Sequence, residues 1–526
     1  MTTLTFWRDR GGASRRPRYR CMRSVFLRGL GLVYLAAFGS MAAQVDGLIG
    51  SRGISPAAEY LAEAGRILKL QPSTYWRLPT LCWLDASDWT LHALCWGGVA
   101  LSMALVAGFL PGLCAALLWL FYLSIVVVGQ NFLSYQWDSL LLEAGLLAVL
   151  LAPWGVRLGR ARDEPWGFAV WLVRWLVFRL MFLSGAAKLA SQDPAWSDWK
   201  ALEYHYQTQP LPAWTSWYIH QMPPWFHELS VGFMFYAELV APFFIVGPRA
   251  IRLAGFVSLV LLQVLIAGTG NYGFFNLLTV VLCLSLLDDR DAEWVQRVSR
   301  HLRQRREWLW SWVFDRRRSI ADRAAEESEP RGSGRSWSWP RRVVAGMLGG
   351  VIIAVTAGQT VKDVWPGSAV PAGLITLIRQ VAPLRSFNTY GLFAVMSTKR
   401  PEIVVEASDD GVIWMPYGFH WKPSELDRAP RFTTPHLPRL DWQMWFAALG
   451  GDCRTQPWFL RFQRRLLEGE PEVLGLLRDN PFPARPPRYV RARLYLYKFT
   501  GWGSTDWWAR EDQGLFCPPL ALDAFE

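Results

Sequence analysis

The sequence has few cysteines and histidines, and none of them is spaced as a metal-binding motif. There are seven of each among 526 residues. No two cysteines form a CxxC pair, and no Cys/His spacing resembles a zinc site. We therefore expect no bound metal. A disulfide between Cys453 and Cys517 stays open at this point, because sequence alone does not establish a pairing.

Two features common in membrane carriers are also missing. The apolar segments have few charged residues in their middle, and no pair of them is interrupted by Gly and Pro. Many secondary transporters bind their substrate at the bilayer midplane, between helices that are broken in this way. The sequence therefore argues against a transporter.

The sequence does contain a series of long apolar runs. It is 52% hydrophobic and has 31 tryptophans. A helix needs about 20 apolar residues to cross a hydrocarbon core of roughly 30 Å, with about 17 as a lower limit. Tryptophan is enriched at the two membrane interfaces. We predict an α-helical polytopic membrane bundle, with the lipid bilayer as a partner. Its eight or nine transmembrane helices come from the runs 24–43, 90–109, 112–128, 138–153, 167–187, 230–247, 253–268, 273–287 and 343–358.

The net charge of +12 indicates orientation in the membrane rather than a nucleic-acid partner. If the N-terminus is cytoplasmic and the nine runs each cross once, all arginine clusters fall on the cytoplasmic side. This is the positive-inside pattern. We expect no nucleic acid to bind. The clusters are Arg8–Arg28, Arg157–Arg162, Arg249 with Arg252, and Arg290–Arg342.

The first apolar run resembles a signal peptide, because basic residues precede it. However, Arg28 interrupts the run and further spans follow it. We therefore interpret it as a retained first helix.

The predicted organisation follows from these runs. The parts are a basic cytoplasmic N-terminus (1–23), a transmembrane bundle (24–287) with outside loops at 44–89 and 189–229, a cytoplasmic charged segment (288–342), a last transmembrane helix (343–360) and an extracytoplasmic β-rich domain (385–526).

The C-terminal part loses the membrane runs and gains strand-like segments. YVRARLYLYKFT alternates apolar and polar residues, as a half-buried strand does. ASDDGVIW places Asp-Asp-Gly between two strand segments, which is typical of a hairpin. Other strand-like pieces are EIVVEAS and VIWMPYGFHW, and DWQMWFAALG reads as a helical insert. We predict a soluble β-rich domain with the fold of a β-sandwich.

Several polar residues lie within or beside the apolar runs. Charged groups at the bilayer centre are costly and usually face the bundle interior, where they pair. Gln136, Ser139 and Glu143 lie within about 60° of one another on a helix and form one polar stripe. Asp138 lies off that stripe and near the helix start, where the helix dipole favours a carboxylate. The intramembrane candidates are Gln136, Asp138, Glu143, Glu238 and Asn276.

Lys188 ends the fifth apolar run, in LSGAAKL. One interpretation is a lysine whose ammonium extends to the outer interface. The other is a partly desolvated amine whose lowered pKa suits a general base.

The outside loop that follows carries further candidates. They are Tyr204, His205, His220 and His227. The spacing of the three histidines matches no standard zinc motif.

Six stretches together resemble the lipase maturation factor family. The resemblance runs from about residue 44 to about residue 500. The stretches are GQNFLSYQWDSLLLEAG, LSGAAKL, ALEYHYQTQPLP, YIHQMPPWFHELSV, TGNYGFFNLLT and PHLPRLDWQMWFAAL.

The resemblance implies a chaperone-like role in the secretory pathway. Family members in animals sit in the endoplasmic reticulum membrane and assist folding and assembly of secreted lipases. Their soluble C-terminal part binds the client, which corresponds to 385–500 here. The Arg/Ala/Trp-rich sequence has a bacterial character, and in a bacterium the domain would face the periplasm from the inner membrane. In a eukaryote the membrane would be that of the endoplasmic reticulum.

The membrane part is also faintly similar to the vitamin K-dependent gamma-carboxylase superfamily. There a lysine at the end of a membrane helix, followed by an acidic residue and a tryptophan, is the catalytic base. The matching position is Lys188, with Asp193 and Trp196 downstream. Two functions stay open: a maturation factor without catalysis or cofactor, and a membrane enzyme that uses Lys188 as the base. A bound lipid or quinone would favour the second.

Overall fold

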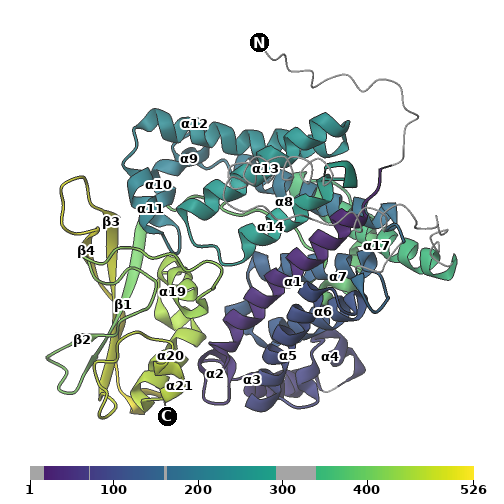
Figure 1. The fold of residues 1–526 in the computed structure, drawn as a ribbon. Coiled ribbons are helices and arrows are strands. Elements are labelled where there is room, and N and C mark those ends of the chain that lie inside the picture. Colours follow the sequence, from purple (N-terminus) through teal and green to yellow (C-terminus); the bar gives the residue numbers. More distant parts are fainter. Residues whose placement is uncertain (1–16, 70, 159–162, 292–338, 366, 526) are drawn as a thin grey trace, which may run out of the picture.

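The computed structural model describes residues 17–525, except 70, 159–162, 292–338 and 366. Helices form a bundle, and a sheet with its own helices lies beside one part of it (Figure 1). Most of the predicted basic N-terminus and of the charged segment 288–342 lies outside the described residues.

Within the described part, seven helices are long and apolar enough to cross a membrane. Each is at least 18 residues long, which is close to the minimum for a bilayer core. The helix that starts with α12 continues through a π-helical turn, η4 (Tyr236–Val240), and η5 (Ala241–Val246). The seven are α1 (Arg20–Ala42), α5 (Asp88–Ala107), α6 (Pro111–Val128), α8 (Gly167–Ala190), α12 (Pro224–Phe235) with its continuation, α13 (Arg249–Thr269) and α17 (Trp339–Val364).

The prediction of eight or nine spans is therefore wrong, because two of the nine runs form shorter helices. The run 138–153 is part of α7 (Gln136–Leu151), which has 16 residues and a length of about 24 Å. The run 273–287 is α14 (Phe275–Cys283) followed by η6 (Leu284–Leu286). Both helices are buried over most of their residues. Their apolar composition therefore reflects burial among other helices rather than contact with lipid.

The parts of the basic clusters that the structure describes lie at the same end of the bundle. At the start of α1, Arg20 forms an ion pair with Glu164, at 2.7 Å, and its backbone N–H donates to Asp289. At the start of α13, Arg252 pairs with Asp288 at 3.2 Å. The start of α1, the segment before α8, the start of α13 and the segment after η6 thus share one end, as the positive-inside pattern requires. The two shorter helices, α7 and α14 with η6, therefore also carry the chain back through the bundle to this end.

Short helices fill the long connections in the rest of the bundle. They are α2 (Val45–Ile49), α3 (Ala57–Leu68), α4 (Pro72–Arg77), η1 (Leu81–Trp83), η2 (Gln130–Leu133), α9 (Pro194–Ser197), α10 (Ala201–Thr208), α11 (Trp214–His220), α18 (Ala372–Val381) and η7 (Ala382–Leu384).

The C-terminal part contains one antiparallel sheet with the strand order β2-β1-β3-β4. The strands are β1 (Arg400–Ser408), β2 (Met415–Pro416), β3 (Tyr489–Phe499) and β4 (Trp508–Leu520). Helices between β2 and β3 cover one face of this sheet, with α19 packed on β1 and α20 on β3. These helices are α19 (Arg439–Leu449), η8 (Cys453–Thr455), α20 (Pro457–Glu468) and α21 (Pro471–Leu474), and η9 (Leu522–Phe525) follows β4.

The strands predicted from EIVVEAS and YVRARLYLYKF are confirmed, as are the hairpin after Ser408 and the helix in DWQMWFAALG. The predicted sandwich is wrong for the described residues, because the apolar face of the one sheet packs against helices instead of a second sheet. A disulfide joins Cys453 in η8 to Cys517 in β4, with a Cα–Cα distance of 5.5 Å.

Asp138 attaches the C-terminal part to the bundle. It lies in the first turn of α7, as predicted, but it is completely buried. Both of its carboxylate oxygens accept hydrogen bonds from the guanidinium of Arg439, at 2.6 and 2.7 Å. Arg439 is the first residue of α19, so this ion pair joins a bundle helix to the helical layer of the sheet. The Tyr122 hydroxyl donates a further hydrogen bond to Asp138, at 2.5 Å.

The predicted polar stripe on α7 also faces protein. Glu143 is buried and pairs with Arg179 of α8. It also accepts hydrogen bonds from the Tyr390 hydroxyl, at 2.7 Å, and from the backbone N–H of Asn388, at 3.4 Å. Gln136 accepts one from the backbone N–H at residue 391, at 3.4 Å. The stripe therefore binds the irregular segment 388–391, which leads into the sheet.

We expect Asp138→Asn to weaken the attachment of the C-terminal part. The substitution leaves the Arg439 guanidinium buried without its counter-charge, and breaking a buried pair in this way costs about 3–5 kcal/mol. Thermal unfolding of the purified protein in detergent should show a lower apparent Tm, and limited proteolysis should cut faster within 386–518.

The matched control is Glu63→Gln, which removes one member of the exposed Glu63–Arg66 pair on α3. Exposed pairs contribute little to stability, so this variant should unfold like the wild type. Equal stability of Asp138→Asn and the wild type would contradict the role assigned to the buried pair.

Candidate functional site: a cavity beside Lys188 and Glu238

Lys188 and Glu238, two of the predicted candidates, form an ion pair in the structure. Lys188 is near the end of α8 and is only 4% exposed. Its ammonium donates to both carboxylate oxygens of Glu238, at 2.7 and 2.9 Å, and to the Ser184 carbonyl, at 3.3 Å. It also lies 5.4 Å from the centre of the Trp196 ring, a distance typical of a cation–π contact. The lysine therefore does not extend to the interface.

Glu238 reaches this position from the π-helical turn η4. Such turns are rare in α-helices and are often found at functional sites. Gly185 lies beside this turn on α8, and a Cβ there would be 2.8 Å from Leu239. The absence of a side chain at Gly185 thus lets the two helices approach closely enough for the pair to form.

The ion pair lies in the wall of a cavity of about 570 Å³. The volume is within the range of roughly 300–1,000 Å³ that is usual for small-molecule sites. The lining is mostly apolar and comes from α8, α10, α12, α13 and the segment before β1. Polar side chains are concentrated in a few places, as in sites that orient a largely apolar ligand.

His205 also lines the cavity, and it belongs to a chain of hydrogen bonds. Its Nε2 lies 3.0 Å from the Tyr272 hydroxyl, which in turn lies 2.9 Å from Oε1 of Gln209. The ring packs edge-on against Phe393, with centroids 4.9 Å apart. Burial, and then the positive charge of Lys188, lower the pKa of His205 to about 4. The imidazole is therefore neutral at pH 7.

The other outside-loop candidates, Tyr204, His220 and His227, pack against neighbouring residues and do not line the cavity. Tyr204 packs against the small apolar cluster that contains Trp196 and Met234. His220 lies against Phe499, and burial, followed by the neighbouring His227, lowers its pKa.

The buried His227 is bound to the Met222 carbonyl at 3.0 Å. In the part of the chain that the structure describes, no three His, Cys, Asp or Glu side chains are placed to hold a metal ion.

The last intramembrane candidate, Asn276, does not line the cavity itself but contacts a residue that does. Its side-chain amide donates to Gln263, at 2.9 Å, and Gln263 lines the cavity. Asp193 of the carboxylase-like motif lies elsewhere: it caps α9 and accepts a hydrogen bond from the backbone N–H of Met396, at 2.5 Å.

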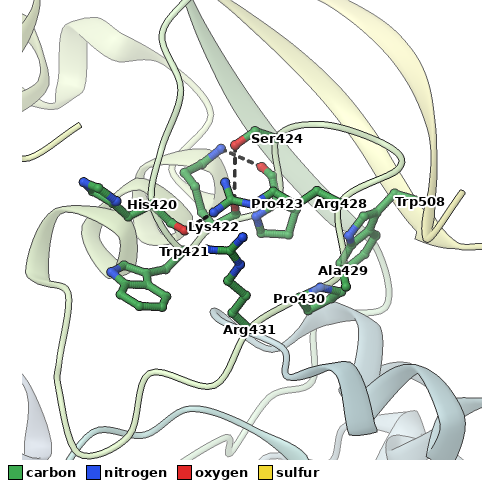
Figure 2. A pocket seen from close by; sticks show the side chains of 10 residues that line it. All are labelled: His420, Trp421, Lys422, Pro423, Ser424, Arg428, Ala429, Pro430, Arg431 and Trp508. Carbon is green, nitrogen blue, oxygen red and sulfur yellow. Dashed lines mark hydrogen bonds between the residues drawn. The ribbon is translucent and has the colours of Figure 1, made fainter. Parts of the chain in front are cut away.

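A second hollow lies in the C-terminal part and is lined by basic and aromatic side chains (Figure 2). Its volume of about 10 Å³ leaves room for about one water molecule. Two of its cations already have partners: Lys422 pairs with Glu402 at 3.0 Å, and Arg428 donates to the His420 carbonyl at 2.8 Å. This hollow therefore offers no space for a larger ligand, and we assign the candidate site to the cavity beside Lys188.

Sequence reasoning singled out Lys188 and Glu238 separately, and it missed the partners of Asp138, Glu143 and His205. Arg179 could have been found, because an arginine within an apolar run requires a carboxylate partner. Tyr272 and Arg439 lie in two of the stretches that resemble the family, TGNYGFFNLLT and PHLPRLDWQMWFAAL, but nothing in these stretches indicates which residues they contact. Their roles come from contacts with residues far away in the chain.

Comparison with known proteins gives consistent matches over most of the chain. Residues 21–294 match the lipase maturation factor transmembrane domain, and residues 386–518 match the lipase maturation factor C-terminal domain. No solved structure matches the chain.

Three relatives illustrate the extent of the similarity. Lipase maturation factor 2 of Xenopus tropicalis is 38% identical, over 96% of this chain and 83% of its own length. Lipase maturation factor 2 of Homo sapiens is 37% identical over the same shares. Lipase maturation factor 1 of Mus musculus is 33% identical, over 95% of this chain and 87% of its own length.

The lowered pKa of His205 predicts a loss of stability in acid. A histidine in the unfolded chain has a pKa of about 6.5, so it takes up a proton there before the folded protein does. The stabilising effect of the neutral ring is complete above about pH 6.5. It is lost as the pH falls towards about 4, the pKa of His205 in the folded protein. At pH 5 the loss is about 2 kcal/mol.

The apparent Tm of the purified protein, measured at pH 8 and pH 5, checks this. We expect a smaller drop for His205→Gln, whose amide can still donate to Tyr272 but does not titrate. An equal drop in both proteins would show that His205 does not titrate as described.

Proposed function

We propose that this chain, which belongs to the lipase maturation factor family, is a membrane-anchored factor that assists the folding or assembly of secreted proteins such as lipases. The names of its relatives and its membrane-spanning helices support this role. On this proposal the C-terminal domain faces the secretory side and binds the client, with 385–500 as the client-binding region. The membrane is that of the endoplasmic reticulum in a eukaryote and the inner membrane in a bacterium.

The observation that carries the proposal is the hairpin between β1 and β2. Asp410 accepts hydrogen bonds from the backbone N–H groups of Val412 and Ile413, at 2.8 and 2.9 Å, and so holds the turn. Val412 and Ile413 are 78% and 67% exposed. Figure 1 shows β2 at the edge of the sheet away from the bundle. Apolar side chains held in water on an ordered turn are a feature of protein-binding surfaces.

The disulfide between Cys453 and Cys517 supports the same side for the domain. Disulfides form and persist in oxidising compartments, such as the endoplasmic reticulum lumen and the periplasm. A partly folded secreted protein is present in those compartments. The buried Asp138–Arg439 pair would hold the client-binding domain in a fixed position on the membrane bundle.

We expect Val412→Asp to reduce client maturation about fivefold, equivalent to about 1 kcal/mol of binding free energy. The carboxylate would have to be desolvated against the apolar surface of the client. The measurement is the secreted activity of a lipase expressed together with the variant in cells that lack a relative of this protein.

Val156→Asp is the matched control. Val156 is 59% exposed and lies at the other end of the bundle, beside the turn between α5 and α6. This variant should support wild-type secretion. Equal secretion with both variants would contradict the proposal that the hairpin between β1 and β2 binds the client.

A second candidate function is a membrane enzyme with Lys188 as general base and a lipid-soluble cofactor. Its support is the position of Lys188 in the wall of a mostly apolar cavity. In the observed geometry, however, the amine has three acceptors around it, two from Glu238 and one from Ser184. An ammonium held in this way has no lone pair to accept a proton, so we place this candidate second.

Two variants distinguish a Lys188 that acts as a general base from a Lys188 that only stabilises the fold. Lys188→Met alone leaves Glu238 buried without its partner and should lower stability by about 3–5 kcal/mol. The double variant Lys188→Met/Glu238→Gln removes both charges, and we expect it to recover both stability and client maturation. A double variant that folds normally but is inactive would instead support Lys188 as a base. Apparent Tm and secreted lipase activity, measured together, distinguish these outcomes.

A further inference from the structure

The cavity beside Lys188 is lined on one side by α12 and α13. In Figure 1, α12 lies along the top of the molecule and α13 lies below it. The two helices approach closely near η4 and η5. There the Tyr236 hydroxyl is 3.2 Å from that of Ser258, and a Cβ at Gly255 would be 2.9 Å from the Cβ of Phe244. Towards the start of α12, side chains of both helices line the cavity. The cavity is therefore a wedge between two helices that are close at one end only.

Exposed leucines form the rim of this wedge. Leu229 of α12 is 65% exposed and Leu265 of α13 is 49% exposed, and both line the cavity. Both helices belong to segments that are long and apolar enough to cross a membrane. Exposed leucines on such helices face hydrocarbon. The opening therefore leads sideways into the bilayer, a route that suits a molecule with a long apolar chain.

The cavity wall has no net charge among the described lining residues. Its two charged side chains, Lys188 and Glu238, neutralise each other. A carboxylate head group would find no free cation there and would lie close to the Glu238 carboxylate. Bringing a second anion into such a site is unfavourable, because a buried charge without a counter-charge loses its hydration without compensation. The wall thus disfavours fatty acids and other anionic amphiphiles.

The hydrogen-bond chain at His205 leaves one acceptor free. The Gln209 amide nitrogen donates to the Thr269 and Tyr206 carbonyls, at 2.7 and 3.2 Å, so its oxygen must accept from Tyr272. The Tyr272 hydroxyl has only one hydrogen, and therefore His205 Nε2 donates to it. The Nδ1 atom of the neutral ring then has a lone pair and no partner among the described residues. Because His205 lines a mostly apolar cavity, such a lone pair is best satisfied by a hydrogen-bond donor inside the cavity.

We infer that the cavity binds one neutral amphiphile whose head group donates a hydrogen bond, such as a lipid alcohol. Its hydroxyl binds His205, and its apolar chain lies between α12 and α13 and leaves through the rim at Leu229 and Leu265. The inference concerns the membrane part alone. It holds or fails independently of client binding by the C-terminal domain.

Photolabelling of the full-length protein in phosphatidylcholine nanodiscs tests the inference. Two probes carry a diazirine at the same carbon of the same chain, one as oleyl alcohol and one as oleic acid. We expect the alcohol to label residues 226–233 and 262–269 at least fivefold more than the acid. Excess unlabelled oleyl alcohol should abolish this labelling, whereas oleic acid should not.

Two sets of variants locate the site. Leu265→Trp blocks the rim and should lower labelling about fivefold, whereas Leu261→Trp should not. Leu261 is 44% exposed on the same helix but does not line the cavity. His205→Phe should remove the preference for the alcohol, and His205→Gln, which keeps an acceptor, should retain part of it.

Some results would overturn the inference. They are equal labelling by the two probes, labelling spread over all apolar helices, and full labelling of Leu265→Trp. If that variant aggregates on gel filtration, Ser230→Phe fills the cavity from α12 instead. If neither variant folds, the competition experiment on the wild-type protein decides.

Discussion

The ion pair between Asp138 and Arg439 is the interaction on which the arrangement of this molecule depends. An ionised carboxylate on a helix inside an apolar bundle is unstable unless a cation reaches it. Here the cation comes from α19, the helix that packs on β1, one of the two inner strands of the sheet. The bundle therefore reaches charge balance only when the C-terminal domain is docked on it. For this reason we expect the bundle and the domain to unfold together, although different parts of the sequence encode them.

The same docking shapes the cavity. The polar stripe of α7 holds the segment 388–391 through Glu143 and Gln136. This segment continues into Phe393, whose carbonyl accepts a hydrogen bond from the Trp196 ring nitrogen at 3.0 Å and whose ring packs on His205. Phe393 and its neighbour Leu392 both line the cavity. A change in how the C-terminal domain sits on α7 would therefore move part of the cavity wall, which gives this domain and the cavity a physical connection.

Much of the local structure could be predicted from the sequence. Apolar runs of membrane length gave the seven long helices, and period-two alternation gave β3. The number of spans and the sandwich were wrong for one reason: apolar residues show that a segment is buried but not what buries it. In α7 the covering partner is protein and not lipid, and in the C-terminal domain it is a layer of helices and not a second sheet.

The sequence by itself determined the membrane class, the family and the residues that could not stay unpaired. Gln136, Asp138, Glu143, Lys188 and Glu238 stood out because polar groups in apolar segments require partners. Only the tertiary structure decided which partners they have. Lys188 meets Glu238 across 50 residues, and Asp138 meets Arg439 across 301. Pairings over such distances depend on helix packing and domain docking, and no periodicity or motif in the chain encodes them. The opening between α12 and α13 is of the same kind, since its shape comes from where two helices diverge.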